Sequence, residues 1–304
     1  PQIIDDYVEF LLNPGHGGHA IGSRNPRSDD GSYTPATIKK KVTALNKFTD
    51  FCQAQYWLAD EPVTSEVRNR VPSDPRSPIE KVKAIMPEQT QRLITAVKRE
   101  VKEAAGNPER QARAIRNYAM IVLMLQHTLR IHEVHLLDVE DYDPDAMSFG
   151  SITVFGKGSK ERTIPLSKSG KSALQTWLNV RRLYVDAEVE EQPLFISMGR
   201  EAGFGEFGTR LSVRSIRYMV DKHLEACKLK REGISAHSLR HTGATNMVIA
   251  ALEKGEDPDT FLLAQFMGHA DSRITEQTYI HLGRMIVDNP AMRIDGMFGE
   301  LEMG

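Results

Sequence analysis

The sequence predicts a mainly α-helical protein with a smaller β component, built from two domains. Apolar residues recur at helical spacing along most of the 304 residues, and a chain of this length can form two domains. One stretch instead holds two β-rich runs, "SITVF" and "RTIPL", joined by a Gly- and Lys-rich turn, which predicts a small antiparallel sheet. Five prolines between Glu61 and Pro87 prevent a continuous helix there and mark a domain boundary.

The first domain is expected to contain two helices joined by a loop. The segment "PQIIDDYVEFLL" and the segment "TPATIKKKVTALNKFTDFCQAQYWL" have helical spacing, and Thr34 suits the N-cap of the second helix, with Pro35 in its first turn. Its expected buried stripe consists of Ile38, Val42, Leu45, Phe48 and Phe51 or Cys52. The pattern fits a solvated face and a phosphate-contacting face equally well for Lys39, Lys40, Lys41 and Lys47.

The proline-rich segment 61–87 carries five basic residues from Arg68 to Lys83 and predicts an extended linker. The domains are therefore expected at 1–75 and 76–304. Helices are predicted over 88–104 and 110–127, and the second is apolar enough to be buried. The hairpin follows, and helices are expected from about 168 onward, interrupted by the Gly-rich "SMGREAGFGEFGT".

The composition narrows the function classes. The 39 Lys and Arg against 41 Asp and Glu give a formal net charge of -2, so a nucleic-acid partner would have to be met by local basic patches. Cys52 and Cys227 are too few for a disulfide framework and match no metal-ligand spacing. The longest apolar run, "YAMIVLML", is far shorter than the ~18 residues that a membrane span needs. The cysteine count therefore favours a reducing cytosol over export, and the apolar runs are too short for a membrane span.

Several residues could carry chemistry, although each alone has an ordinary structural explanation. Arg130 with Glu133 three residues later is commonly a structural pair, and Lys157 and Lys160 lie on a hairpin turn. In "ISAHSLRHTGATNM", the residues His237 and Arg240 share one face of a predicted helix. His269 follows Gly268 at an expected helix end, and Tyr279 lies ten residues beyond it.

Together these residues supply what phosphoryl transfer to a protein nucleophile requires without a metal. Two arginines can neutralise the non-bridging oxygens of the transition state by bidentate hydrogen bonds. A tyrosine hydroxyl with a pKa near ~10 is a weak nucleophile at neutral pH and needs nearby cations or a base such as histidine. A lysine beside the phosphate can protonate the leaving alkoxide.

Five blocks of the chain, "LRIHEV", "GKGSKERTIPL", "HSLRHTGAT", "FMGHAD" and "QTYIHL", closely resemble the signature blocks of the tyrosine recombinases, also called the phage integrase family. The resemblance covers roughly residues 88–285, and "YTPATIKKKVTALNKFTDFC" is similar to that family's N-terminal core-binding domain. It implies a two-domain DNA clamp, with a helical core-binding domain and a mixed helical catalytic domain. It also implies site-specific cutting and rejoining of duplex DNA without metal or nucleotide cofactor.

The resemblance also implies a role for individual residues. Tyr279 would be the nucleophile that forms a 3'-phosphotyrosyl link, and Lys157 the acid for the 5'-oxygen. Glu133 would orient its neighbours, whereas a supporting or packing role is expected for His241. Arg130, Arg240, His237 and His269 would complete the catalytic set, and Lys39, Lys40, Lys41, Lys47, Arg76 and Lys160 would contact DNA.

Three departures from the family pattern stand out. His127 and Thr128 replace a usual Thr-Gly pair, His132 replaces a common serine, and the interval from His269 to Tyr279 is one residue longer than in many members. None of these changes removes a catalytic group, but they are expected to alter how the nucleophile is delivered.

The expected partners are double-stranded DNA with inverted-repeat core sites and further copies of the chain in a tetrameric synapse, in the cytoplasm and nucleoid of a bacterium or archaeon. In the tail 291–304, the residues Ile294, Met297, Phe298 and Leu301 form one apolar stripe, which could dock on a neighbouring protomer or on its own domain. Two alternatives stay open at this point. One is a type IB topoisomerase, and the other is a sequence-specific DNA-binding protein without catalysis.

Overall fold

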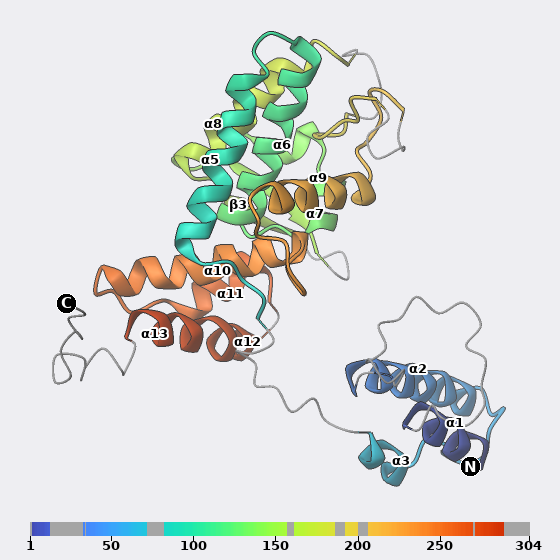
Figure 1. Ribbon diagram of the computed structural model, residues 1–304. Coiled ribbons are helices and arrows are strands. Elements are labelled where there is room, and N and C mark those ends of the chain that lie inside the picture. The colour runs from blue at the N-terminus through green and yellow to red at the C-terminus, as the bar shows by residue number, and fades with distance from the viewer. Residues whose placement is uncertain are drawn as a thin grey trace, which may run out of the picture. The chain divides into compact units, whose positions relative to one another are not determined.

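The computed structural model describes residues 2–12, 33, 35–71, 82–156, 161–185, 192–199, 206–269 and 271–288. The chain forms two compact units, Pro1–Arg76 and Ser77–Gly304, and each is described by itself. The described residues are mainly helical, with one small antiparallel sheet, so the predicted fold class is confirmed (Figure 1). None of the helices in these residues is long and apolar enough to cross a membrane.

Within its described residues, the first unit has three helices around a small apolar core: α1 (Gln2–Leu12), α2 (Pro35–Ala54) and α3 (Ser65–Arg70). Helix α3 corrects the prediction of an extended linker from residue 61. Because the eight residues between Val63 and Arg70 contain no proline, one short helix forms there, and the Thr64 side chain caps it by accepting a hydrogen bond from the Val67 amide. The core consists of Val8, Leu11, Tyr33, Ile38, Val42, Val63 and Val67.

The predicted stripe of α2 is only partly right. Ile38, Val42 and Cys52 are buried, but Phe48 is 61% exposed and Phe51 is 52% exposed. Thr49 takes the inward position instead, because the 38, 42, 49 and 52 positions keep one helical face, and its hydroxyl donates to the Asn46 carbonyl oxygen at 2.9 Å. The proposed N-cap, Thr34, lies outside the described residues.

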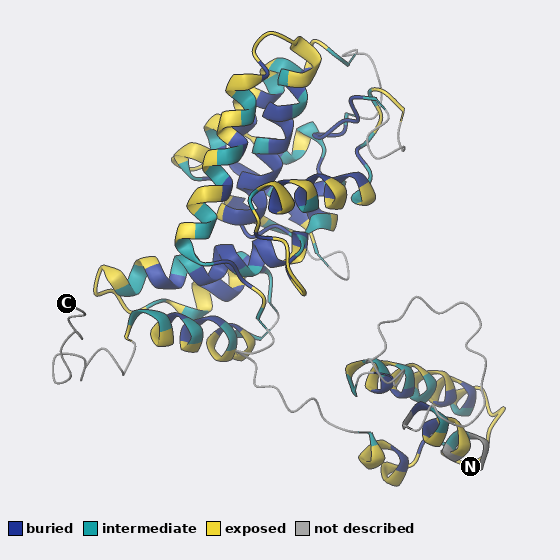
Figure 2. Cartoon of the chain, viewed as in Figure 1, coloured by how far each residue is buried: buried dark blue, intermediate teal, exposed yellow. Residues whose placement is uncertain are grey.

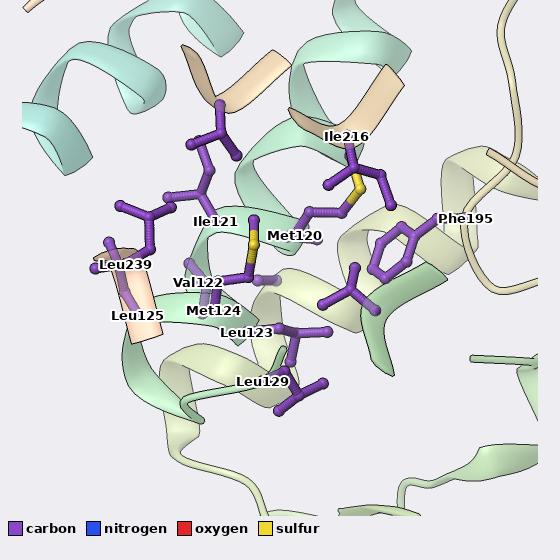
Figure 3. Close-up of a cluster of buried hydrophobic side chains, with 14 of the residues drawn as sticks. Met120, Ile121, Val122, Leu123, Met124, Leu125, Leu129, Phe195, Ile216 and Leu239 are labelled. Carbon is purple, nitrogen blue, oxygen red and sulfur yellow. The ribbon is translucent and has the colours of Figure 1, made fainter. Parts of the chain in front are cut away.

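The second unit is built around a buried helix. Helix α6 (Pro108–Gln126) begins at the capping residue Asn107, and Figure 2 shows it dark blue along most of its length, beside the amphipathic α5 (Pro87–Glu103). In Figure 3 its residues Met120 to Leu125 lie among Phe195, Ile216 and Leu239, which come from distant parts of the chain. Both predicted helices of this region are therefore present, and α6 forms the centre of the larger core.

The sheet of this unit has the order β1-β2-β3, from β1 (Tyr142–Asp143), β2 (Ser151–Phe155) and β3 (Glu161–Pro165). Thr153 pairs with Thr163 and Ile152 with Ile164, as expected of the predicted hairpin, whose turn 157–160 is outside the described residues. Strand β1 was not predicted, because two residues are too few for a periodic signal. The helices that complete the unit are α7 (Ile131–Leu136), η1 (Val139–Asp141), α8 (Lys168–Arg181), α9 (Val213–Ala226), α10 (Ala236–Glu253), α11 (Thr260–Met267), α12 (Ser272–Thr275), the π-helical turn η2 (Glu276–Ile280) and α13 (His281–Val287).

Helix α10 packs on both α6 and α13 (Figure 1). Its Gly243 lies so close to α6 that a Cβ atom there would come within 2.0 Å of the Leu125 carbonyl oxygen. This close approach brings the first turns of α10 against the segment that follows α6, where Arg130 begins the next helix.

Candidate active site

The start of α7, strand β3, the first turns of α10, the end of α11 and the turn η2 meet at one cluster of side chains joined by hydrogen bonds and ring contacts, which is called the pocket below. Arg130 is the N-cap of α7, and Glu133 in the first turn of that helix accepts two hydrogen bonds from it. The Arg130 amide donates to Glu133 Oε2 at 2.7 Å, and Arg130 Nη1 donates to Oε1 at 2.7 Å. Arg130 Nη2 reaches the Gly268 carbonyl oxygen at 3.3 Å. The guanidinium group is therefore fixed between two elements but still about one-third exposed.

Arg162 of β3 is a member of this pocket that the sequence analysis did not single out. Its Nη1 and Nη2 donate to Glu133 Oε1 and Oε2 at 2.9 and 3.0 Å, a bidentate pair with a carboxylate that is 3% exposed. Burial tends to raise the pKa of Glu133, but the hydrogen bonds from Arg162 and Arg130 outweigh it and lower the pKa. The sequence could have indicated this position of Arg162, because the residue shares a strand face with the buried Ile164. A buried guanidinium group needs a partner of opposite charge.

Arg240 is almost completely buried beside these groups. Its Nη1 donates to the Thr128 carbonyl oxygen at 2.5 Å and lies 4.0 Å from Glu133 Oε2, while Nη2 donates to the Met267 carbonyl oxygen. Burial, and then the charge of Arg130, lower its pKa to about 10, so the group remains a cation at neutral pH. Two carbonyl groups from different segments thus fix the second arginine.

His127 and Thr128, the pair that departs from the family pattern, are both buried, and the Thr128 carbonyl oxygen contacts Arg240. Thr128 has a φ of 51°, a left-handed conformation that costs a residue with a Cβ atom roughly 1–2 kcal/mol and explains the glycine usual there. Burial lowers the pKa of His127 to about 4. Its ring fills the space beside Gly170, where a Cβ atom would lie 2.3 Å from Nε2.

Two histidines, His241 and His269, lie beside the tyrosine, and a third, His237, contacts His241. His237 is exposed, and its ring lies edge-on to the ring of His241 at 4.5 Å between centroids. His241 Nδ1 is 2.6 Å from the Tyr279 hydroxyl oxygen, and His269 Nδ1 is 2.8 Å from Thr275 Oγ1. Desolvation, then neighbouring positive groups, lower the pKa of His237 and bring the pKa of His241 and of His269 to about 4. At neutral pH these rings are therefore uncharged.

Tyr279 is 1% exposed, and burial raises the pKa of its hydroxyl to about 12, although Arg240 and Arg130 act in the opposite direction. The residue lies on η2, where the His281 amide donates to the Glu276 carbonyl oxygen five residues earlier. A π-helical turn holds one residue more than the α-helical turn it replaces. The longer interval from His269 to Tyr279 is thus accommodated in η2, and the tyrosine still reaches the pocket.

The pocket brings together Arg130, Glu133, His237, Arg240, His269 and Tyr279 of the residues expected from the sequence. Lys157, Lys160 and Arg76 lie outside the described residues. In the first unit, Lys39, Lys40 and Lys47 are exposed on α2, whereas Lys41 is half-buried with its Nζ 5.1 Å from the centroid of the Tyr33 ring. Their DNA contacts stay a prediction. His132 is exposed on α7.

A protonated, buried tyrosine beside two fixed guanidinium groups is an arrangement suited to phosphoryl transfer onto a protein nucleophile. Among the described residues, no cluster of three His, Cys, Asp or Glu could hold a metal ion. The chain belongs to the phage integrase family, which matches residues 83–284. The family predicted from the sequence blocks is therefore confirmed.

The chain is similar to curated tyrosine recombinases. It is 27% identical over 285 residues to the tyrosine recombinase XerD of Caulobacter vibrioides, across 92% of this chain and 83% of the relative. It is also 27% identical over 255 residues to the tyrosine recombinase XerC of Caldanaerobacter subterraneus subsp. tengcongensis, across 84% of this chain and 62% of the relative. The enzyme class predicted from the sequence, a tyrosine recombinase, is the class of these relatives.

Two solved structures show the same fold. The XerH site-specific recombinase bound to its palindromic difH substrate, in a post-cleavage complex, aligns with a TM-score of 0.62 at 20% identity, covering 96% of this chain and 72% of that one. The integrase of the transposon Tn1549, in complex with transposon right end DNA, aligns with a TM-score of 0.59 at 17% identity, covering 95% and 85%.

Proposed function

We propose that this protein is a site-specific DNA recombinase that cuts and rejoins duplex DNA through a covalent 3'-phosphotyrosyl link to Tyr279. The observation that carries the proposal is the position of the Tyr279 hydroxyl, which lies in one pocket with Arg130 and Arg240 in a member of the phage integrase family. The proposed reaction serves DNA integration, excision or resolution.

Arg130 and Arg240 act in this proposal as a clamp on the non-bridging oxygens of the scissile phosphate. Both guanidinium groups are held before any DNA arrives, by Glu133 and by backbone carbonyl groups. Preorganised cations stabilise a transition state without a reorganisation cost during the reaction, and one such donor is typically worth about 3 kcal/mol. Lys157 protonates the leaving 5'-oxygen, while His237 and His269 complete the pocket.

The proposed substrate is double-stranded DNA with inverted-repeat core sites. It is supported by the XerH and Tn1549 integrase structures, which contain DNA. Phosphate contacts from exposed lysines such as Lys39, Lys40 and Lys47, together with Lys41, Arg76 and Lys160, supply affinity in this proposal, which is therefore expected to fall with added salt. A tetrameric synapse of protomers in the bacterial or archaeal cytoplasm is the proposed active assembly.

We expect Tyr279→Phe to abolish covalent attachment to DNA and to leave binding of a half-site nearly intact, because the hydroxyl forms the bond but carries no charge at rest. The wild-type protein is first incubated with a pool of nicked, random-sequence duplexes, and the trapped adducts are sequenced to obtain the site. The variant is then compared on that site with Tyr118→Phe, which alters a half-buried tyrosine of α6 outside the pocket. An adduct formed by Tyr279→Phe would refute the proposal, and relaxation of plasmids lacking the site would indicate a topoisomerase.

The tail 291–304 lies outside the described residues, and we propose that it docks on a second copy of the chain in the synapse. A pocket of about 420 Å³ beside His269 is a candidate surface, lined by Phe261, Ala264, Gln265, His269, Asp271, Ser272 and Arg273. Deleting 291–304 is expected to weaken cooperative binding to paired sites and to deregulate cleavage, while one protomer still binds a half-site. Gel-shift titrations on half and paired sites measure this. Unchanged cooperativity and recombination would contradict the docking.

A further inference from the structure

The Tyr279 hydroxyl contacts a histidine to which no catalytic role was assigned. His241 follows Arg240 on the rigid helix α10, and its Nδ1 lies 2.6 Å from Tyr279 Oη. The two rings are 5.8 Å apart between centroids and tilted by 31°. Because the tyrosine is 1% exposed, this contact is not in competition with bulk water.

The other two histidines of the pocket are placed differently. The ring of His269 is stacked on the Tyr279 ring at 6.3 Å, and its Nδ1 is engaged with Thr275 Oγ1. The ring of His237 contacts His241 edge-on. Among the described residues, the basic nitrogen that meets the phenolic hydroxyl is therefore that of His241.

We propose that His241 is the general base that takes the Tyr279 proton during cleavage and returns it during rejoining. This inference rests on the proposed function. As an electron pair of Tyr279 Oη forms the bond to phosphorus, its proton moves to His241 Nδ1. The bond from phosphorus to the 5'-oxygen breaks, and that oxygen receives a proton from the acid of the site. In rejoining, the 5'-hydroxyl attacks phosphorus and returns its proton to the acid of the site. The bond from phosphorus to Tyr279 Oη breaks, and the tyrosine oxygen recovers its proton from His241.

The charges around His241 suit this exchange. His237 and Arg240 face it from its own helix, and His269 and Tyr279 face it from the opposite side of the pocket. Desolvation, and then the neighbouring His237, Arg240 and His269 side chains, lower the pKa of His241 to about 4, so the ring is neutral and can accept a proton at rest. A phosphate diester brings a negative charge to Arg130 and Arg240, and so offsets their effect on the imidazolium as it forms.

One test needs no DNA. If Nδ1 accepts the hydrogen bond of the tyrosine, neutral His241 must carry its proton on Nε2. Nitrogen-15 NMR of the full chain at neutral pH reads this tautomer from the ring nitrogen shifts, with His241→Asn used to assign the signals. We expect the Nε2-protonated form. A proton on Nδ1 would make His241 a donor to the tyrosine and would overturn the proposal.

The second test separates proton transfer from positioning. His241→Asn keeps an oxygen acceptor near the place of Nδ1 but cannot take a proton, and it is expected to slow single-turnover adduct formation by about 10²-fold or more without weakening half-site binding. His241→Gly is expected to recover part of the loss with added imidazole, in proportion to its free-base form. The matched control is His135→Asn, in which the amide can still donate to the Leu211 carbonyl oxygen that His135 Nδ1 now meets at 2.8 Å.

The outcomes distinguish the two proposals. Adduct formation that survives Tyr279→Phe refutes the recombinase function proposed for this site. Adduct formation that requires Tyr279 but proceeds in His241→Asn within a few-fold of the wild-type rate refutes only the general base.

Discussion

At the scale of single residues, one glycine decides how closely the arginines of the pocket approach the backbone. Gly268 ends α11 with a φ of 66°, and a Cβ atom there would come 2.9 Å from Cζ and Nη1 of Arg162. The absence of a side chain lets that guanidinium lie against the turn whose carbonyl oxygen accepts a hydrogen bond from Arg130. The residue is therefore required both for its conformation and for the room it leaves.

Substitution of Gly268 separates these two requirements. Gly255 has a φ of 75° and open space at the Cβ position, so Gly255→Ala is expected to cost only the left-handed strain of roughly 1 kcal/mol. Gly268→Ala is expected to cost at least about 1 kcal/mol more, since Arg162 must move from Glu133. Urea unfolding of both variants measures the difference. Equal losses would mean that Arg162 yields freely at this position.

At the scale of elements, η2 explains how a longer link still delivers the tyrosine. Thr275 and Tyr279 are buried at either end of the turn, whereas Glu276 and Gln277 are exposed between them. The surplus residue is thus carried on the solvent side, and the buried contacts on both sides of it are kept.

Deleting Gln277 is therefore expected to convert η2 to an α-helical turn, to change the free energy of unfolding by less than about 1 kcal/mol, and to retain cleavage by Tyr279. The matched control deletes Gln265, an exposed glutamine within the regular helix α11. That deletion rotates Gly268 and His269 by about 100° about the helix axis and should abolish cleavage. Loss of cleavage on deleting Gln277 would show that the π turn itself positions the nucleophile.

At the scale of the whole molecule, buried histidines make the fold sensitive to acid. The pKa values of His127, His241 and His269 are lowered to about 4 in the folded protein, from 6.5 in their ordinary state. The unfolded chain therefore binds more protons between these values. The stabilisation is complete above pH 6.5 and is lost as the pH falls toward 4.

We expect the free energy of unfolding to fall between pH 6.5 and 4 by up to about 1.4 kcal/mol per pH unit for each of His127 and His241, and by less for His269, which solvent partly screens. Urea unfolding at a series of pH values measures the slope. His127→Thr should reduce the slope by about one proton. An unchanged slope in that variant would show that His127 is protonated without unfolding.

Much of the fold followed from periodicity and turn residues. Helices α5 and α6 were predicted because their apolar spacing is long and regular, and the hairpin because two β-rich runs flank a Gly- and Lys-rich turn. Helix α3 was missed because six residues between prolines carry little periodic signal, and Phe48 was misplaced because one shift in register along α2 exchanges buried and exposed positions.

The candidate site was predictable to the extent that motifs identify residues. Arg130, Arg240 and Tyr279 could be named from their blocks, and the structure brings them into one pocket. The contact of His241 with Tyr279 could not be predicted, because it joins residues 38 positions apart and depends on how η2 packs on α10. Sequence spacing gives the distance between two residues along the chain, whereas this contact depends on the direction in which each side chain leaves its helix.

The bonds of Glu133 have a consequence for the thermodynamics of the protein. Among the described residues, Arg130, Arg162 and Arg240 share this one carboxylate as their anionic neighbour, which leaves a local surplus of positive charge in a poorly hydrated place. In the proposed function, an anionic phosphodiester supplies the missing counter-charge. The same contacts would then contribute both to DNA binding and to folding. A bound cognate duplex is therefore expected to stabilise the folded domain, and release of the product is expected to return the domain to its less stable form.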